Sequence, residues 1–183
     1  MRMLKTIAAV ALFATLAAAQ HSKAAGPADV LSTVEAHKSL TMFRTSLISS
    51  GVASMLRSDG PFTVIAPTDQ AFANVPKDEM QKLLTHPAAM NFLLARYVVR
   101  GNIASRDAAG FSSAKTLMGV NLRSENPNGE LTVNGAKIVE GDIRCANGVV
   151  HVVNSIDFSL VREAIAIASP APTLTTKSQT PKP

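Results

Sequence analysis

The sequence of 183 residues has no tryptophan, one tyrosine and one cysteine, and only 17% of its residues are charged. A single cysteine cannot form a disulfide within the chain. Cys145 lies just before a turn, which favours a buried thiol that acts as a small hydrophobic side chain, with an intermolecular disulfide as the alternative. Beyond the N-terminal region, no apolar run reaches the ~18 residues that a membrane-spanning helix needs. The absences therefore favour a domain held together by packing, without a transmembrane segment.

The N-terminal region carries the longest apolar run, from Thr6 to Ala19, preceded by Arg2 and Lys5. This pattern predicts a secretory signal peptide over residues 1–19 with cleavage after Ala19. Residues 20–26 are small and polar and are expected to form a flexible segment. The protein is therefore expected to be exported, either to the periplasm or to the medium.

The formal net charge is +5 and the isoelectric point is about 9.7, but the excess of basic residues lies in the two ends of the chain. Five of the 18 basic residues are found there: Arg2, Lys5, Lys23, Lys177 and Lys182. The remaining 13 match the 13 acidic residues, and they are spread singly along the chain. A nucleic-acid partner is excluded, because such proteins gather Lys and Arg on one face.

Between the two ends lies one domain, expected over residues 27–168 and followed by a disordered Pro/Thr-rich tail over 169–183. Apolar residues recur at helical spacing up to Ala95 and at every second position after Arg96. Helices gathered early and strands gathered late predict an α+β fold.

Helices are expected after Asp29, after Thr41, and over Val52–Leu56, Lys77–Leu84, Pro87–Ala95 and Leu160–Ala168. Strands are expected over Phe62–Ala66, Tyr97–Val99, Lys115–Met118, Val120–Ser124, Glu130–Val133, Ala136–Val139, Asp142–Cys145 and Val149–Val153. Asn-Gly pairs at 128–129, 134–135 and 147–148 suit the positive φ angles of tight hairpin turns.

Two segments resemble the signatures of a known family. Phe62–Phe72 (FTVIAPTDQAF) and Asn147–Ile156 (NGVVHVVNSI) are similar, in order and spacing, to the two signatures of the fasciclin-like (FAS1) domain. The resemblance implies a wedge of two antiparallel or mixed β-sheets with packed N-terminal helices, in which the two signature strands are neighbours. The lack of any Asn-x-Ser/Thr glycosylation acceptor and the short signal fit a bacterial exported protein of this type.

The polar residues of the signatures have structural interpretations. Thr68 and Asp69 follow a buried strand and are expected to cap free backbone N–H groups where a helix begins. His151 stands alone in an apolar strand, where the backbone or the Asp69 side chain could satisfy its ring nitrogens.

No enzymatic mechanism is supported by the remaining residues. The four histidines lie in unrelated segments without the spacing of a zinc site, and neither a Gly-x-Ser-x-Gly elbow nor a glycine-rich phosphate loop is present. We therefore expect no catalytic residue, no metal and no cofactor.

Binding is the function that remains. The resemblance implies an adhesion module that contacts a protein, a cell-envelope polysaccharide or a second copy of itself. Some fasciclin-like proteins carry carotenoids, so the alternative is a carrier of an apolar small molecule. Family members that bind animal cell-surface receptors often have Tyr-His where this chain has Tyr97-Val98. Tyr97, Val98 and Met118 are the expected interaction surface.

Overall fold

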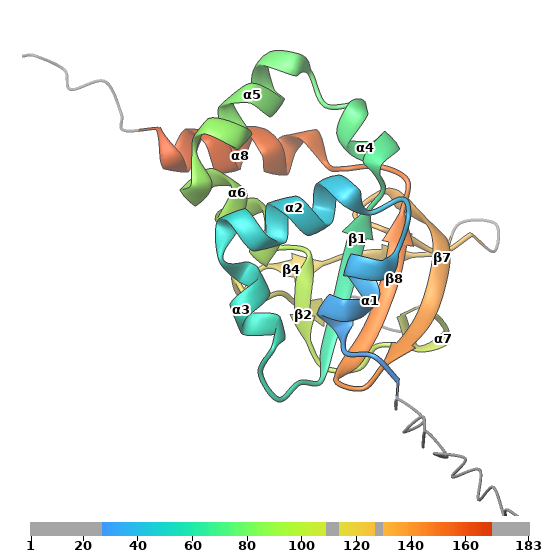
Figure 1. Ribbon diagram of the computed structural model, residues 1–183. Helices are drawn as coiled ribbons and strands as arrows, with labels where there is room; N and C mark the ends of the chain where they lie inside the picture. Colours follow the sequence, from blue (N-terminus) through green and yellow to red (C-terminus); the bar gives the residue numbers. More distant parts are fainter. Residues whose placement is uncertain (1–26, 109–113, 127–129, 170–183) are drawn as a thin grey trace, which may run out of the picture.

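The computed structural model describes residues 27–108, 114–126 and 130–169 (Figure 1). The expected signal peptide, the segment 20–26, the Asn128-Gly129 turn and residues 170–183 of the expected tail lie outside this range. The described elements are α1 (Val30–Ala36), α2 (Thr41–Ser50), α3 (Val52–Leu56), β1 (Phe62–Pro67), α4 (Asp69–Ala73), α5 (Lys77–Thr85), α6 (Pro87–Ala95), β2 (Val98–Arg100), α7 (Ser105–Ala108), β3 (Ala114–Lys115), β4 (Asn121–Leu122), β5 (Ser124–Glu125), β6 (Thr132–Val133), β7 (Ala136–Cys145), β8 (Gly148–Val153) and α8 (Phe158–Ala168).

The helices and strands form an α+β fold as predicted, and the strands form two sheets, as the family resemblance implies. The larger sheet has the order β2-β1-β8-β7-β6-β5, and the smaller one pairs β3 with β4. The smaller sheet is tied to the larger by an antiparallel bridge between Val99 and Thr116.

The two signature strands, β1 and β8, are direct neighbours and run parallel, with Ile65 opposite His151. Every residue of both strands is buried, because helices cover one face of the sheet and the smaller strands the other. A strand that is covered on both faces needs apolar side chains at successive positions, which explains the near-continuous apolar sequence of β8.

Strand β7 differs from the prediction. The segments Ala136–Val139 and Asp142–Cys145, expected as two strands, are one strand that pairs first with β6 and then with β8. The register shifts on both sides of Glu140, and Asp142 adopts a left-handed φ of 57°. The irregularity bends the strand without ending it. The strands predicted between residues 115 and 133 are shorter than expected.

The Asn-Gly pairs also differ from one another. Asn134 and Gly135 have φ angles of 50° and 77°, as a tight hairpin requires. Asn147 and Gly148 do not have positive φ, so the prediction for that pair is wrong. Gly148 is required there for space, because a Cβ atom would lie 2.0 Å from the Phe62 carbonyl oxygen.

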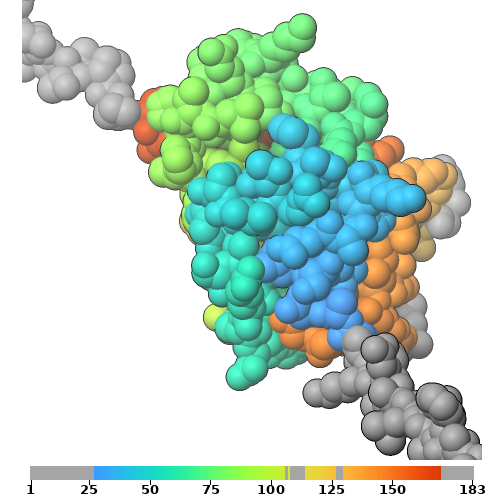
Figure 2. Space-filling view, in the orientation of Figure 1, coloured from blue at the N-terminus to red at the C-terminus, as the bar shows by residue number. Residues whose placement is uncertain are grey.

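Helices close the core from two sides. Figure 2 shows α1, α2 and α3 covering one face, while α5, α6 and α8 pack together at one end of the molecule (Figure 1). The largest fully buried side chains are apolar apart from His151: they include Phe43, Leu47, Leu56, Phe62, Leu83, Leu93 and Leu94. Among the described residues, no helix is long and apolar enough to cross a membrane.

Candidate binding site

The end of the first signature holds two helices in place. The Thr68 side chain accepts a hydrogen bond from Ala71 N–H at 3.2 Å, which makes Thr68 the N-cap of α4 as predicted. Asp69 caps a different helix from the one expected: its Oδ1 accepts from Met42 N–H of α2 at 2.7 Å. The N–H group of Asp69 in turn donates to the Ser39 carbonyl oxygen at 2.8 Å. Asp69 therefore fixes the start of α2 against the end of β1.

His151 is 2% exposed, and both of its ring nitrogens have backbone partners. Nε2 lies 2.8 Å from the Ile103 carbonyl oxygen, and Nδ1 accepts from Asp142 N–H at 3.2 Å. The ring is therefore the neutral tautomer with its proton on Nε2. Of the two expected partners, the structure shows the backbone and not Asp69.

The expected interaction surface is only partly exposed. Tyr97 is 6% exposed, and its hydroxyl oxygen accepts from Asp157 N–H at 3.2 Å. Val98 of β2 is fully buried, between Val64 of β1 and Leu117. The expectation that these two residues face a partner is wrong, since their side chains belong to the core. Met118 is 42% exposed, in the turn between β3 and β4.

Asn147 belongs to a predicted turn, and the structure shows that its side chain joins two elements and its backbone a third. Oδ1 accepts from Val30 N–H at the start of α1 at 2.8 Å, and Nδ2 donates to the Leu56 carbonyl oxygen at the end of α3 at 2.9 Å. Its backbone carbonyl accepts from Phe62 N–H of β1. The partners lie 85 or more positions away along the sequence, so no local pattern could have indicated them.

The remaining polar groups considered for chemistry are structural. The half-buried Cys145 thiol lies 3.2 Å from Thr33 Oγ1, and burial raises its pKa above the usual value, so the thiol form is favoured. His37 bridges Ser39 Oγ at 3.2 Å and Glu140 Oε2 at 3.1 Å, which ties the end of α1 to β7. No cluster of ligands that could hold a metal is found within the described parts of the chain.

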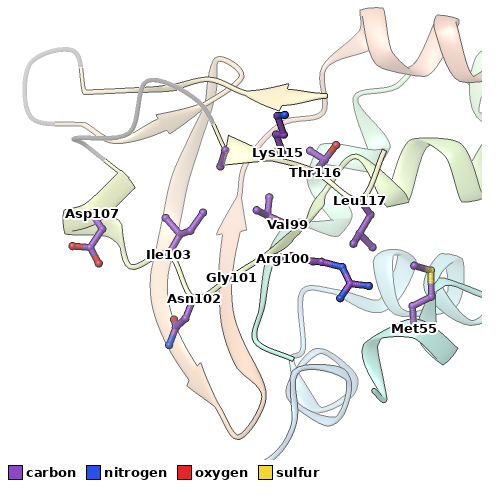
Figure 3. Close-up of a pocket in the computed structure, with 11 residues that line it drawn as sticks. Met55, Val99, Arg100, Gly101, Asn102, Ile103, Asp107, Lys115, Thr116 and Leu117 are labelled. Atoms are coloured by element: carbon purple, nitrogen blue, oxygen red, sulfur yellow. The ribbon is translucent and has the colours of Figure 1, made fainter. Parts of the chain in front are cut away.

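A cleft with a volume of about 820 Å³ opens beside β2. Figure 3 shows its lining: Met55 of α3, the segment from Val99 to Ile103, Asp107 of α7, and β3 with the residues that follow it. Val99, Ile103 and Leu117 supply apolar surface, and Arg100 and Lys115 supply positive charge. Among the residues that the structure describes, the lining includes no histidine, cysteine or aromatic side chain.

Below this cleft lies a small apolar void between the sheets, with a volume of about 30 Å³. Val99, Ile103 and Ala114 line both spaces and separate them. The floor of the void is formed by Ile65 and His151 of the two signature strands. The cleft and the signatures are thus parts of one region of the fold.

Comparison with known proteins identifies the family. The family model of the fasciclin domain matches residues 38–156. The chain belongs to the fasciclin-domain family. The match runs from the loop before α2, through β1 and the cleft, to the residues after β8.

Relatives of this fasciclin domain occur in animals and bacteria. The transforming growth factor-beta-induced protein ig-h3 of Sus scrofa is 27% identical over 67% of this chain, which spans 18% of that protein. The uncharacterized protein sll1735 of Synechocystis is 30% identical over 61% of this chain, which spans 84% of it. A solved FAS1 domain pair from the insect cell adhesion molecule Fasciclin I matches with a TM-score of 0.58 at 18% identity, over 73% of this chain and 52% of that one. The last match confirms the predicted FAS1 fold.

Proposed function

We propose that this fasciclin domain is a non-enzymatic binding module that acts outside the cytoplasm, in adhesion or in contact with the cell envelope. The observation that carries the proposal is the cleft beside β2, whose lining combines apolar side chains with two cations. A likeness to a domain pair of a cell adhesion molecule supports the same class of function. The apolar N-terminal segment, with its preceding basic residues, supports export.

The chemistry of the described site favours binding over catalysis. Both ring nitrogens of His151 are occupied by the backbone, so the ring has no position left for a substrate proton. The cleft lining offers Arg100, Lys115 and Asn102, which recognise charge or donate hydrogen bonds. Recognition by a protein surface or by an envelope polysaccharide needs only such groups, and association with a second copy needs no more.

Binding of the purified chain to isolated envelope fractions tests this proposal. We expect saturable binding that the double variant Arg100→Gln/Lys115→Gln weakens. The double variant Lys77→Gln/Lys82→Gln removes the same charge from exposed positions of α5 and should bind like the parent chain. No saturable binding to envelope material, or equal weakening by both pairs, would contradict adhesion through this cleft.

The second candidate function is carriage of an apolar small molecule such as a carotenoid. The void between the sheets favours this function, because it adds apolar surface next to the cleft. Ile65, Leu122, Val133 and Ile138 supply that surface. A volume of about 30 Å³ holds a group the size of a water molecule, so a carotenoid would occupy the open cleft instead. Native mass spectrometry and a visible spectrum after incubation with a carotenoid extract test this function. A stoichiometric adduct with a shifted band supports it, and an unliganded mass contradicts it.

A further inference from the structure

Two basic residues occupy opposite positions on strands β2 and β3. The antiparallel bridge between Val99 and Thr116 places Arg100 and Lys115 at the next pair of positions. Side chains alternate along a strand, so Val99 and Thr116 share the buried face, and both cations share the face toward the cleft. The structure therefore brings two positive charges to one wall of the cleft.

Neither cation forms an ion pair with another described residue, whereas the buried Arg96 is paired with Glu163 at 2.8 Å. The one acidic side chain of the described lining, Asp107, lies beyond Ile103, away from Met55 (Figure 3). Like charges directly opposite each other on neighbouring strands destabilise a sheet. An anionic group bound between them would remove this repulsion and would gain charge-assisted hydrogen bonds from both side chains.

Apolar side chains lie at the end of the cleft toward which Arg100 extends. Figure 3 shows Arg100 reaching along the cleft toward Met55, with Leu117 beside them. Met55 is 43% exposed although it lies in an otherwise well-packed helix. The described residues of the lining include no aromatic side chain on which a sugar ring could stack. A flexible methionine and branched aliphatic side chains are suited to contact an alkyl chain.

We propose that the cleft binds a single-chain anionic amphiphile, a long-chain carboxylate. The carboxylate lies between Arg100 and Lys115, and the alkyl chain lies along Met55 and Leu117. A cleft of about 820 Å³ is within the range of small-molecule sites. The inference extends the second candidate function from an apolar ligand to a charged one, and it does not depend on adhesion.

Isothermal titration of the purified chain with three ligands tests the proposal: dodecanoate and dodecyltrimethylammonium, both below their micellar concentrations, and acetate. We expect dodecanoate to bind with one-to-one stoichiometry. Dodecyltrimethylammonium has the same alkyl chain and the opposite charge, and should bind at least about tenfold more weakly. Acetate has the charge without the alkyl chain. Its binding should not saturate, because acetate buries almost no apolar surface.

Variants separate the two parts of the site. Arg100→Gln/Lys115→Gln should weaken dodecanoate binding by about tenfold or more, and Lys77→Gln/Lys82→Gln should leave it unchanged. Met55→Ser should weaken the binding of both amphiphiles, because it removes apolar contact and leaves the charges in place. All substituted positions are exposed, so thermal melting should confirm that the variants fold.

Three results would overturn the proposal: no binding of dodecanoate, equal affinity for the two amphiphiles, or undiminished binding by the Arg100→Gln/Lys115→Gln variant. A failure of dodecanoate with intact binding to envelope fractions would reject the ligand and leave the adhesion proposal standing.

Discussion

Buried and half-buried polar side chains in this domain hold elements together that are distant in sequence. Asp69, Asn147 and His151 each bond to backbone groups of other elements. Such a bond satisfies a donor or acceptor that would otherwise be buried without a partner, and leaving that group unpaired costs more free energy than the bond itself contributes. The signature residues are thus explained by the backbone groups they satisfy, independently of any ligand.

Replacement of Asp69 by alanine tests its role as a cap supplied from another element. The Asp69→Ala variant leaves Met42 N–H without its acceptor, and we expect the free energy of unfolding to fall by ~1–2 kcal/mol. Asp69→Asn keeps an acceptor oxygen in the same position, so its free energy of unfolding should fall by less. Urea denaturation measures both, with the exposed Asp59→Ala as the matched control. A loss in Asp69→Ala no larger than in the control would contradict the assignment.

His151 is the most deeply buried polar side chain of the second signature, and its removal should be costly. In His151→Ala the Ile103 carbonyl and Asp142 N–H lose their partner, so we expect destabilisation by ~1–3 kcal/mol. The loss appears as a lower midpoint of thermal unfolding. His86→Ala changes an exposed histidine and serves as the control. An unchanged midpoint in His151→Ala would reject the structural role.

Tyr97 couples stability to alkaline pH. Burial raises the pKa of its hydroxyl above the usual value of about 10, so the folded state favours the protonated form. The resulting contribution to stability is fully present below pH ~10 and is lost as the pH rises through the folded-state pKa. Since Tyr97 is the only tyrosine of the chain, ultraviolet absorbance of the phenolate reports on it alone.

We expect no phenolate signal at pH 10–11 in the folded protein. In urea, about half of the tyrosine should be ionised at pH 10 and about nine-tenths at pH 11. Tyr97→Phe should retain more of its stability than the parent chain between pH 10 and pH 12. Ionisation of the folded protein near pH 10 would show that the ring is accessible and would contradict its burial.

At the scale of elements, the close approach of β1 and β8 depends on a residue without a side chain. A Cβ atom at Gly148 would lie 2.0 Å from the Phe62 carbonyl oxygen, so Gly148→Ala must move one of the two strands. We expect a loss of about 3 kcal/mol in denaturant unfolding. Gly119→Ala is the matched control, because its φ of 74° is strained for alanine while the space around it is open. The free energy of unfolding of Gly119→Ala should fall by only about 1–2 kcal/mol. A larger fall in Gly119→Ala than in Gly148→Ala would contradict the requirement for space at Gly148.

The sequence predicted local features of the fold and missed contacts between distant segments. Hydrophobic period and turn residues located most of the helices, β1 and β8, and the hairpin at Asn134-Gly135, because each depends on neighbours along the chain. The family resemblance supplied the adjacency of β1 and β8. The partner of Asp69 is 27 residues away, and the partners of Asn147 lie in three other elements. Such contacts follow from tertiary structure, which no local pattern contains.

The candidate site was harder to predict than the fold. The family resemblance predicts Tyr97 and Val98 at an interaction surface, yet both side chains are buried next to the central strand β1. Arg100 and Lys115 are separated by 15 positions, and only the bridge between β2 and β3 brings them to one wall. Neither residue stands out in the sequence, since each is one of 13 basic residues spread along the domain.

At the scale of the whole molecule, the cleft lies at the boundary between two regions that differ in packing. Strands β1 and β8 are buried at every position, and α6 packs its Leu93 and Leu94 into the same core. Strands β3 and β4 have two residues each and are half exposed. They are attached to β2 by the bridge at Val99 and by the bond from Leu117 N–H to the Val98 carbonyl.

This difference in packing predicts unequal stability within one domain. Elements with few buried contacts open at low free energy, whereas the core opens only with global unfolding. Amide hydrogens of β3 and β4 should therefore exchange with solvent at least about a hundredfold faster than those of Val64 and Val150, measured by native-state hydrogen exchange. Amides of Leu93 and Leu94 are the internal reference for the core. Equal protection of β3 and β1 would contradict the prediction. A ligand that spans Arg100 and Lys115 bridges the two regions, so it should slow exchange in β3 while leaving β1 unchanged.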